Sequence, residues 1–128
     1  MIRIDIDPFP DSEQFDALWR AAWGSPAADY LTSILPRSLG HIGAFEGDRL
    51  VGFVNIAWDG GVHAFLLDTA VHPDFRRQGI ATRLVKQATA LARDRGAEWL
   101  HVDFEPHLEG FYRGCGFEPT GAGLIRLK

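Results

Sequence analysis

The sequence predicts an α+β domain with a mixed, mostly antiparallel central sheet and one parallel strand–helix–strand unit. Three observations predict this class. Residues 41–71 hold three apolar runs separated by turn residues, which is typical of an antiparallel meander. Residues 79–95 change to helical spacing, and residues 99–105 alternate again as a strand. A strand–helix–strand connection of this kind is nearly always a right-handed parallel crossover.

The N-terminal third predicts one strand followed by helices. Residues 1–5 alternate apolar and polar side chains, as a strand does. Asp11 lies three residues before Gln14, which is the spacing of a capping box, and apolar residues follow at helical spacing. A helix is therefore expected over residues 12–23, and a second, shorter helix over residues 27–35.

The meander predicts strands over residues 41–45, 50–58 and 62–71. Both faces of the third strand are largely apolar, so we expect it to be central and buried. The apolar stripe that follows predicts a long helix, and Gly96 suits the position just after its end.

Three shorter elements complete the expected chain. After the strand over residues 99–105, residues 108–115 can hold two helical turns, and Gly116 would end them. Residues 117–120 and 124–127 are expected as short final strands around a Gly-rich turn.

Composition limits the classes of function. A chain of 128 residues fits a single domain, residues 1–128. The net charge of −4 argues against nucleic-acid or membrane partners. With one cysteine, Cys115, no internal disulfide or cysteine zinc cluster can form, and no other metal-binding pattern stands out. No apolar run has the length of a membrane span or a signal peptide, so a cytoplasmic location is expected.

The junction between the third strand and the long helix carries the chemistry. A helix N-terminus presents free N–H groups and a positive dipole end, which together bind phosphate. Gly79 and Ala81 are small, so a pyrophosphate can approach the backbone, and Arg76 and Arg77 add positive charge. The same residues are equally compatible with an ordinary turn that two arginines keep soluble.

Two motifs resemble the hallmarks of the GNAT (Gcn5-related N-acetyltransferase) superfamily. Residues 76–81 read R-R-Q-G-I-A and fit its R/Q-x-x-G-x-G/A signature, after a strand ending D-T-A-V-H-P. Residues 111–117 read F-Y-R-G-C-G-F and resemble its F-Y-x-x-x-G-F segment. The resemblance is good from about Leu39 onward. It implies the α/β/α GNAT fold, whose central strands splay apart, and transfer of an acetyl group from acetyl-CoA to a primary amine.

The resemblance also implies where acetyl-CoA binds. Four backbone N–H groups would hold the pyrophosphate, those of Gln78, Gly79, Ile80 and Ala81, with Arg76 and Arg77 nearby. The backbone of Ala70 and Val71 would pair with the pantetheine arm as an added strand. The thioester would then lie in a splay beside residues 99–105, where an N–H near Val71 polarises its carbonyl.

Direct transfer without an acyl-enzyme requires an acid and a base. Tyr112 matches the tyrosine that serves this family as the acid. For the base we favour Asp68, expected on one strand face with Leu66 and Ala70, where apolar surroundings make a carboxylate more basic. Asp68 can equally be bound by a neighbouring loop or only orient the substrate. The alternatives for the base are Glu105, Asp103, His107 and a water relay.

Several functional readings remain open from the sequence. The first is an N-acetyltransferase acting on an unidentified small molecule or peptide, with acetyl-CoA and the amine as its partners. The second is a non-catalytic GNAT-fold module that binds acyl-CoA, and a third is a phosphate-binding domain for another nucleotide. Trp23 and Tyr30 could line an acceptor pocket, although core packing also explains them. Family members are often dimers, so a homodimer is compatible with the resemblance.

Overall fold

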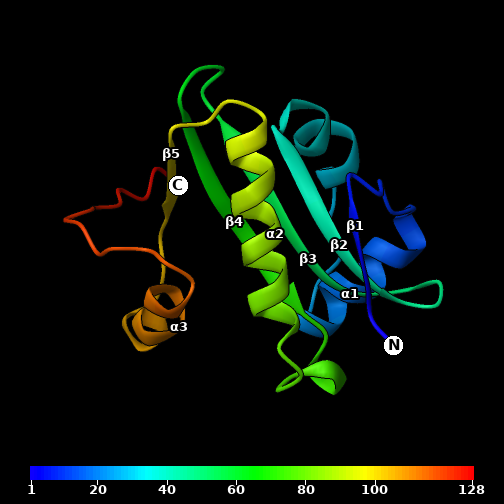
Figure 1. Ribbon diagram of the computed structural model, residues 1–128. Helices are drawn as coiled ribbons and strands as arrows, with labels where there is room; N and C mark the ends of the chain where they lie inside the picture. Colours follow the sequence, from blue (N-terminus) through cyan, green and yellow to red (C-terminus); the bar gives the residue numbers. More distant parts are fainter.

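Five strands form one sheet in the order β1-β2-β3-β4-β5 in the computed structural model, which describes residues 1–128 (Figure 1). The first four strands are antiparallel neighbours, and β5 is parallel to β4. The predicted α+β class and the parallel crossover are therefore confirmed. The strands are β1 (Arg3–Ile6), β2 (Gly40–Glu46), β3 (Arg49–Trp58), β4 (His63–Val71) and β5 (Trp99–Val102).

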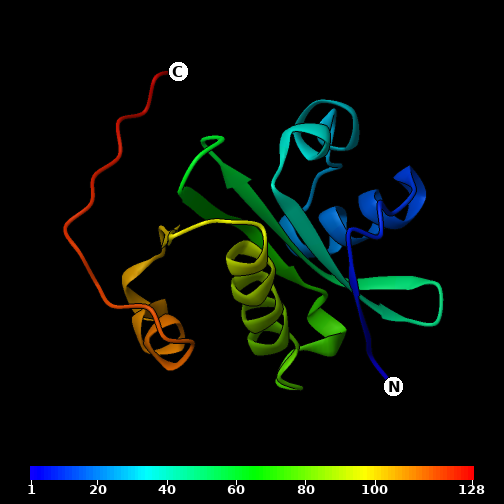
Figure 2. The same ribbon diagram turned by 45° about the horizontal axis from the view of Figure 1, so that its top comes forward.

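Helices cover both faces of this sheet. Helix α2 (Ile80–Asp94) lies on one face, and α1 (Ser12–Trp23) lies on the other, as Figure 2 shows. The α1 face also carries two short helical turns, η1 (Tyr30–Ile34) and η2 (Leu35–Arg37). Two separate buried clusters result, with 16 residues under α2 and 10 under α1, so each face of the sheet has its own core.

The ends of the two long helices follow from local residues. Asp11 accepts a hydrogen bond from the Gln14 amide at 2.8 Å, and the Gln14 side chain accepts one from the Asp11 amide at 3.0 Å. This is the expected capping box, and α1 spans the predicted residues. Helix α2 begins after Gly79 and is followed by Gly96, and both glycines have positive φ angles.

Strand β4 contains a bulge that the alternation of its side chains does not reveal. Phe53 pairs with Ala70 and Asn55 pairs with Leu67, so two residues of β4 stand opposite one residue of β3. Asp68, at the bulge, has a φ of 57°. Because of the extra residue, even-numbered side chains of β4 point to one face of the sheet before the bulge and to the other face after it.

The expectation that β4 is buried on both faces is wrong, although β4 is a central strand. Before the bulge, Ala64 and Leu66 pack under α2, whereas Ala70 after it packs under α1. Phe65 and Leu67 are partly exposed, because α1 does not extend over them.

Other differences concern the short elements. Strand β5 ends at Val102, not at residue 105, and the expected helix over residues 27–35 is replaced by η1 and η2. The 3-10 turn η4 (Pro106–Leu108) leads into α3 (Glu109–Gly114). Residues 118–128, here called the C-terminal arm, form no strand, so the two expected final strands are absent. No helix is both long and apolar enough to span a membrane.

Candidate functional site

Strands β4 and β5 separate where the site was expected. Their parallel pairing runs only from His63 to Leu66 on β4, opposite Trp99 to Val102 on β5. Beyond this point β4 continues to Val71, while the chain after Val102 turns away toward η4. The edge of β4 from Thr69 to Val71 therefore has no neighbouring strand on the β5 side.

A pocket of about 320 Å³ opens at this separation. Five of the predicted site residues line it, namely Ala70, Val71, Arg76, Ala81 and Tyr112. The other walls come from α1, β4, η4 and α3, through Ala22, Trp23, Thr69, Leu108 and Phe111. Eight of the ten lining residues are hydrophobic, so the pocket suits a largely apolar arm or group.

A larger hollow of about 590 Å³ lies elsewhere, between the start of α1 and the turn that joins β2 to β3. Charged and polar side chains such as Asp48, Arg49 and His72 line much of it. None of the predicted site residues lines this hollow, so size alone does not identify the functional site.

The N-terminus of α2 is open to a bound group. Gly79 precedes the helix with a φ of 76°, a left-handed conformation that favours glycine, and no side chain caps the first turn. A Cβ built on Gly79 would meet no atom within 4 Å, so the space beside its backbone is free. The side chain of Ile80 is buried in the core, and only its backbone can take part in binding. These features fit a pyrophosphate held by amide groups.

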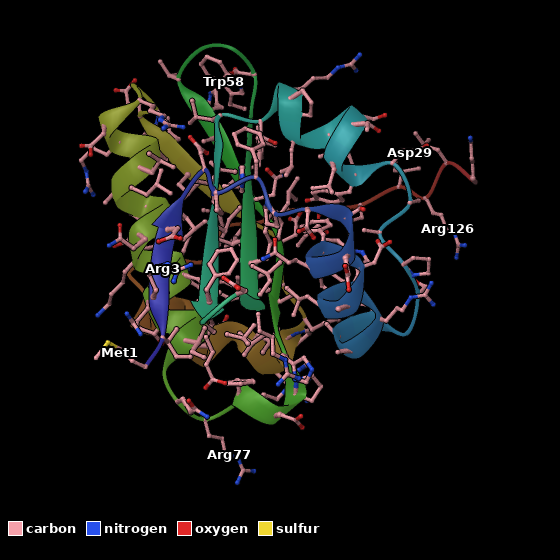
Figure 3. All side chains as sticks on the ribbon, turned by 90° about the vertical axis from the view of Figure 1, so that its right-hand side faces the viewer. Met1, Arg3, Asp29, Trp58, Arg77 and Arg126 are labelled. Carbon is pink, nitrogen blue, oxygen red and sulfur yellow. The ribbon has the colours of Figure 1, made fainter.

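The two arginines at this junction differ in position. Arg76 lines the pocket. Arg77 has a φ of 64°, and its side chain reaches away from the body of the molecule (Figure 3). The structure thus brings one of the two predicted positive charges to the pocket, while Arg77 remains at the outer surface.

Tyr112 joins the pocket to the core under α2. Its side chain is buried, and its ring stacks on Phe104 with the ring centres 5.1 Å apart. Burial raises the pKa of the Tyr112 phenol, while the side chain of Thr69 acts in the opposite direction. The phenol is therefore protonated at neutral pH, as a proton donor must be.

Asp68 lies in a different environment from the one expected. It is exposed, and Leu66 and Ala70 lie on opposite faces because of the bulge, so the expected apolar strand face does not exist. The hydroxyl of Tyr30 instead donates a hydrogen bond of 2.6 Å to Oδ2 of Asp68. Asp68 is not among the residues that line the pocket, although its neighbour Thr69 is.

Asn55 lies buried on the same face of the sheet as Tyr30. It stands opposite Leu67 in the β3–β4 pairing, and its amide makes no hydrogen bond of ordinary length, although it lies near enough to the Tyr30 hydroxyl to oppose the rise in the pKa of that phenol.

Sequence reasoning found some residues of this region and missed others. Trp23 lines the pocket, which is one of the two roles predicted for it. The ring of Tyr30 instead packs in the core under α1, as the other predicted role requires. The bond between Tyr30 and Asp68 was missed, since 38 residues separate them and no local pattern signals it. The alternative bases are exposed and line no part of the pocket: Asp103, Glu105 and His107.

Cys115 shows no feature of a nucleophile. Burial raises the pKa of its thiol, and the side chain packs at the margin of the core under α2. No group of three or more His, Cys, Asp or Glu side chains is placed to hold a metal ion.

Comparison with known proteins agrees with this geometry. An uncharacterised N-acetyltransferase of Porphyra purpurea is 33% identical over 75 residues, which are 57% of this chain and 43% of that protein. A GNAT-family acetyltransferase of Streptococcus pneumoniae is 29% identical, with a TM-score of 0.81 over 100% of both chains. An aminoglycoside N-acetyltransferase solved with CoA is 20% identical, with a TM-score of 0.78 over 100% of this chain and 95% of that one.

Two further facts define the relationship. The matches cover only 43% to 61% of the length of the first curated relatives. The sequence model of the acetyltransferase (GNAT) family matches residues 2–117 of this chain. This range includes the open edge of β4, the start of α2 and Tyr112. The chain belongs to the acetyltransferase (GNAT) family.

Proposed function

We propose that this protein is an N-acetyltransferase that passes the acetyl group of acetyl-CoA directly to a primary amine. One observation carries the proposal. The unpaired end of β4, the uncapped start of α2 and the Tyr112 side chain all meet at a single pocket. Membership of the GNAT family and the CoA complex of a protein with the same fold support it.

Acetyl-CoA would bind along this open edge. The amides of Gln78, Gly79, Ile80 and Ala81 would hold the pyrophosphate, and Arg76 adds a positive charge on the pocket side. The free edge of Ala70 and Val71 would accept the pantetheine arm as a short added strand, because β5 does not pair there.

The reaction forms a C–N bond and breaks a C–S bond. The amine nitrogen attacks the thioester carbonyl carbon, and an N–H near Val71 stabilises the oxygen as negative charge develops on it. When the tetrahedral intermediate collapses, the CoA sulfur leaves and receives a proton from Tyr112. An acceptor that arrives as ammonium gives an N-acetyl amine, the CoA thiol and one released proton.

The base must accept the proton that an alkylammonium carries at neutral pH. We assign this role to Asp68, whose Oδ1 has no hydrogen-bond partner in the protein while Oδ2 is held by Tyr30. The exposure of Asp68 supports access from solvent and from an incoming amine. Asp103, Glu105, His107 and a water relay are the competing assignments.

A second candidate is the non-catalytic module that binds acyl-CoA. The observation that favours it is the position of Asp68, which does not line the pocket. Both candidates bind CoA, but only the N-acetyltransferase transfers the acetyl group. Separate measurements of CoA binding and of acetyl transfer therefore distinguish them.

Two measurements on the purified protein test the proposal. Calorimetry with CoA and acetyl-CoA measures binding, and release of free thiol in a panel of polyamines, aminoglycosides, amino acids and peptides measures transfer. We expect binding of both compounds and release of thiol with at least one amine, whose mass rises by one acetyl group. Binding without transfer to any amine favours the non-catalytic module, and the absence of any heat with CoA contradicts both candidates.

A further inference from the structure

The bulge of β4 brings two successive side chains to the same face of the sheet. In a regular strand Leu67 and Asp68 would point to opposite faces. Leu67 stands opposite Asn55, on the face that carries α1, and Tyr30 on that same face binds the Asp68 carboxylate. The extra residue therefore places a carboxylate beside Leu67, on the α1 side of the sheet.

Beside this carboxylate, the α1 side of β4 and β5 is uncovered and largely apolar. Phe65 and Leu67 are 38% and 40% exposed, and Trp99 on β5 is 62% exposed. His101 stands opposite Phe65 and stacks on it, with ring centres 4.7 Å apart and ring planes inclined by 23°. Exposed apolar groups that gather in one place mark a binding surface, whereas scattered ones do not. The surface, here called the β4–β5 face, consists of six residues: His63, Phe65, Leu67, Asp68, Trp99 and His101.

The ring of Phe65 has one free side. His101 comes from β5 and occupies the side of the ring that faces that strand, and its Nε2 lies 2.9 Å from Nδ1 of His63. The other side of the Phe65 ring is turned toward β3, where the opposite residue is Ala57. The single methyl group of Ala57 does not reach the height of an aromatic ring. A flat aromatic group can therefore stack on Phe65 from this side.

The charge of the β4–β5 face suits a single ammonium group. Asp68 supplies one carboxylate, and none of the six residues is Lys or Arg. Tyr30 holds Oδ2 of Asp68, while Oδ1 has no hydrogen-bond partner in the protein. The rest of the face offers few polar groups, so an acceptor with many hydroxyl or amino groups would lose water there without gaining new partners. The face therefore favours one cationic group joined to an apolar body.

We propose that the acceptor is a primary amine that carries an aromatic ring on a short alkyl chain. The inference rests on the proposed acetyl transfer and names the substrate class for it. The ammonium would bind Oδ1 of Asp68, and the ring would stack on the free side of Phe65. Three residues of extended strand span about 10 Å, so the alkyl chain between ring and nitrogen needs about two to four carbon atoms. The transfer is the one described above and yields the N-acetyl amine, the CoA thiol and one released proton.

Calorimetry on the full chain, with and without CoA, tests this recognition without requiring turnover. The probes are phenylbutylamine and butylamine, which share the amine and differ by the ring. We expect phenylbutylamine to bind roughly tenfold or more tightly, because its ring leaves water when it packs against Phe65. Phe65→Ala should remove most of this difference and leave the affinity for butylamine unchanged. Asp68→Asn should weaken the binding of both amines.

Trp58→Ala is the matched control. Trp58 is 40% exposed, close to the value for Phe65, but it stands opposite Ala64, which packs under α2 on the other face of the sheet. Its removal should change the affinity for neither amine. Phe65→Leu keeps an apolar side chain without a ring and should lose only the part of the preference that depends on stacking. Thermal unfolding of each variant reports whether the fold is intact.

The outcomes separate this inference from the proposed function. Equal affinity for the two amines, or a ring preference that survives in Phe65→Ala, would overturn the inference even if thiol is released with other amines. Ring-selective binding that depends on Phe65, without release of thiol, would support the binding site and contradict the transfer. Light scattering tests another occupant, because a native dimer that Phe65→Ala converts to a monomer would assign the face to a second copy and overturn the inference.

Discussion

The Tyr30 hydroxyl lies 2.6 Å from Oδ2 of Asp68 and joins η1 to the bulge of β4. Burial, together with this bond, raises the pKa of Tyr30, so its phenol stays protonated and acts as the donor. The bond holds the orientation of the carboxylate and occupies one of its oxygens. In the proposed role of Asp68, the other oxygen would bind the acceptor amine.

Tyr30→Phe should therefore impair transfer without unfolding the protein. The phenylalanine ring keeps the contacts with Phe15 and Trp19, and only the hydroxyl is lost. A hydrogen bond to a charged group contributes about 1.5–3 kcal/mol, so we expect kcat/KM for the amine to fall about ten- to hundredfold. The KM for acetyl-CoA should not change.

Asp68→Asn supplies the matched test of that pair. If the bond acts through the carboxylate, Tyr30→Phe should have little further effect in the Asp68→Asn background. Losses that simply add in the double variant would show that Tyr30 acts independently of Asp68.

Tyr112→Phe should separate chemistry from binding. The stacking on Phe104 and the edge contact with Phe111 do not need the hydroxyl, so the pocket keeps its shape. Loss of a general acid costs roughly a hundredfold in kcat, while the Kd for CoA should stay the same in calorimetry. Normal turnover by this variant would rule out Tyr112 as the acid.

Gly79→Ala should weaken CoA binding. A non-glycine residue at a φ of 76° is strained by about 1–2 kcal/mol, and the added methyl group would enter the free space where we propose that the phosphates bind. We expect the Kd for CoA to rise about tenfold or more.

Gly96→Ala is the control for the backbone strain. Gly96 also has a positive φ, and a Cβ there would meet no atom within 4 Å, but the residue lies beyond the opposite end of α2. This variant should lose stability and keep its affinity for CoA. Equal loss of affinity in both variants would show that Gly79 matters only for folding.

The stability of the protein should fall in mild acid because of His41. Its imidazole is 1% exposed, and burial lowers its pKa to about 4 from an ordinary value of 6.5. Between these two values the unfolded chain binds more protons than the folded one, so the free energy of unfolding decreases as the pH falls. The loss amounts to about 3 kcal/mol by pH 4.

Chemical denaturation from pH 7 to pH 4 measures this dependence. His41→Gln removes the imidazole and should flatten the curve, whereas His107→Gln, at an exposed position outside the core, should leave it as in the native chain. An unchanged slope in His41→Gln would assign the acid sensitivity to other groups.

The sequence predicts the helices and strands around the site better than the surroundings of the side chains within it. The capping residues Asp11 and Gln14 and the glycines at 79 and 96 act locally, so the helices could be located without a structure. The environment of Asp68 could not be predicted, because alternation assumes that no extra residue interrupts the ladder. The strands expected over residues 117–120 and 124–127 are absent, because alternation shows only that a segment could pair, and no backbone hydrogen bond joins residues 118–128 to the sheet.

Because β4 contains one extra residue, this part of the chain should tolerate the deletion of a residue poorly. Deleting Thr69 would let the ladder with β3 run without interruption. The side chain of Asp68 would then point to the same face as Ala64 and Leu66, which places its carboxyl group in the apolar core beneath α2. It would also lose its hydrogen bond with Tyr30. A single codon lost here would thus do more harm than many exchanges of side chains.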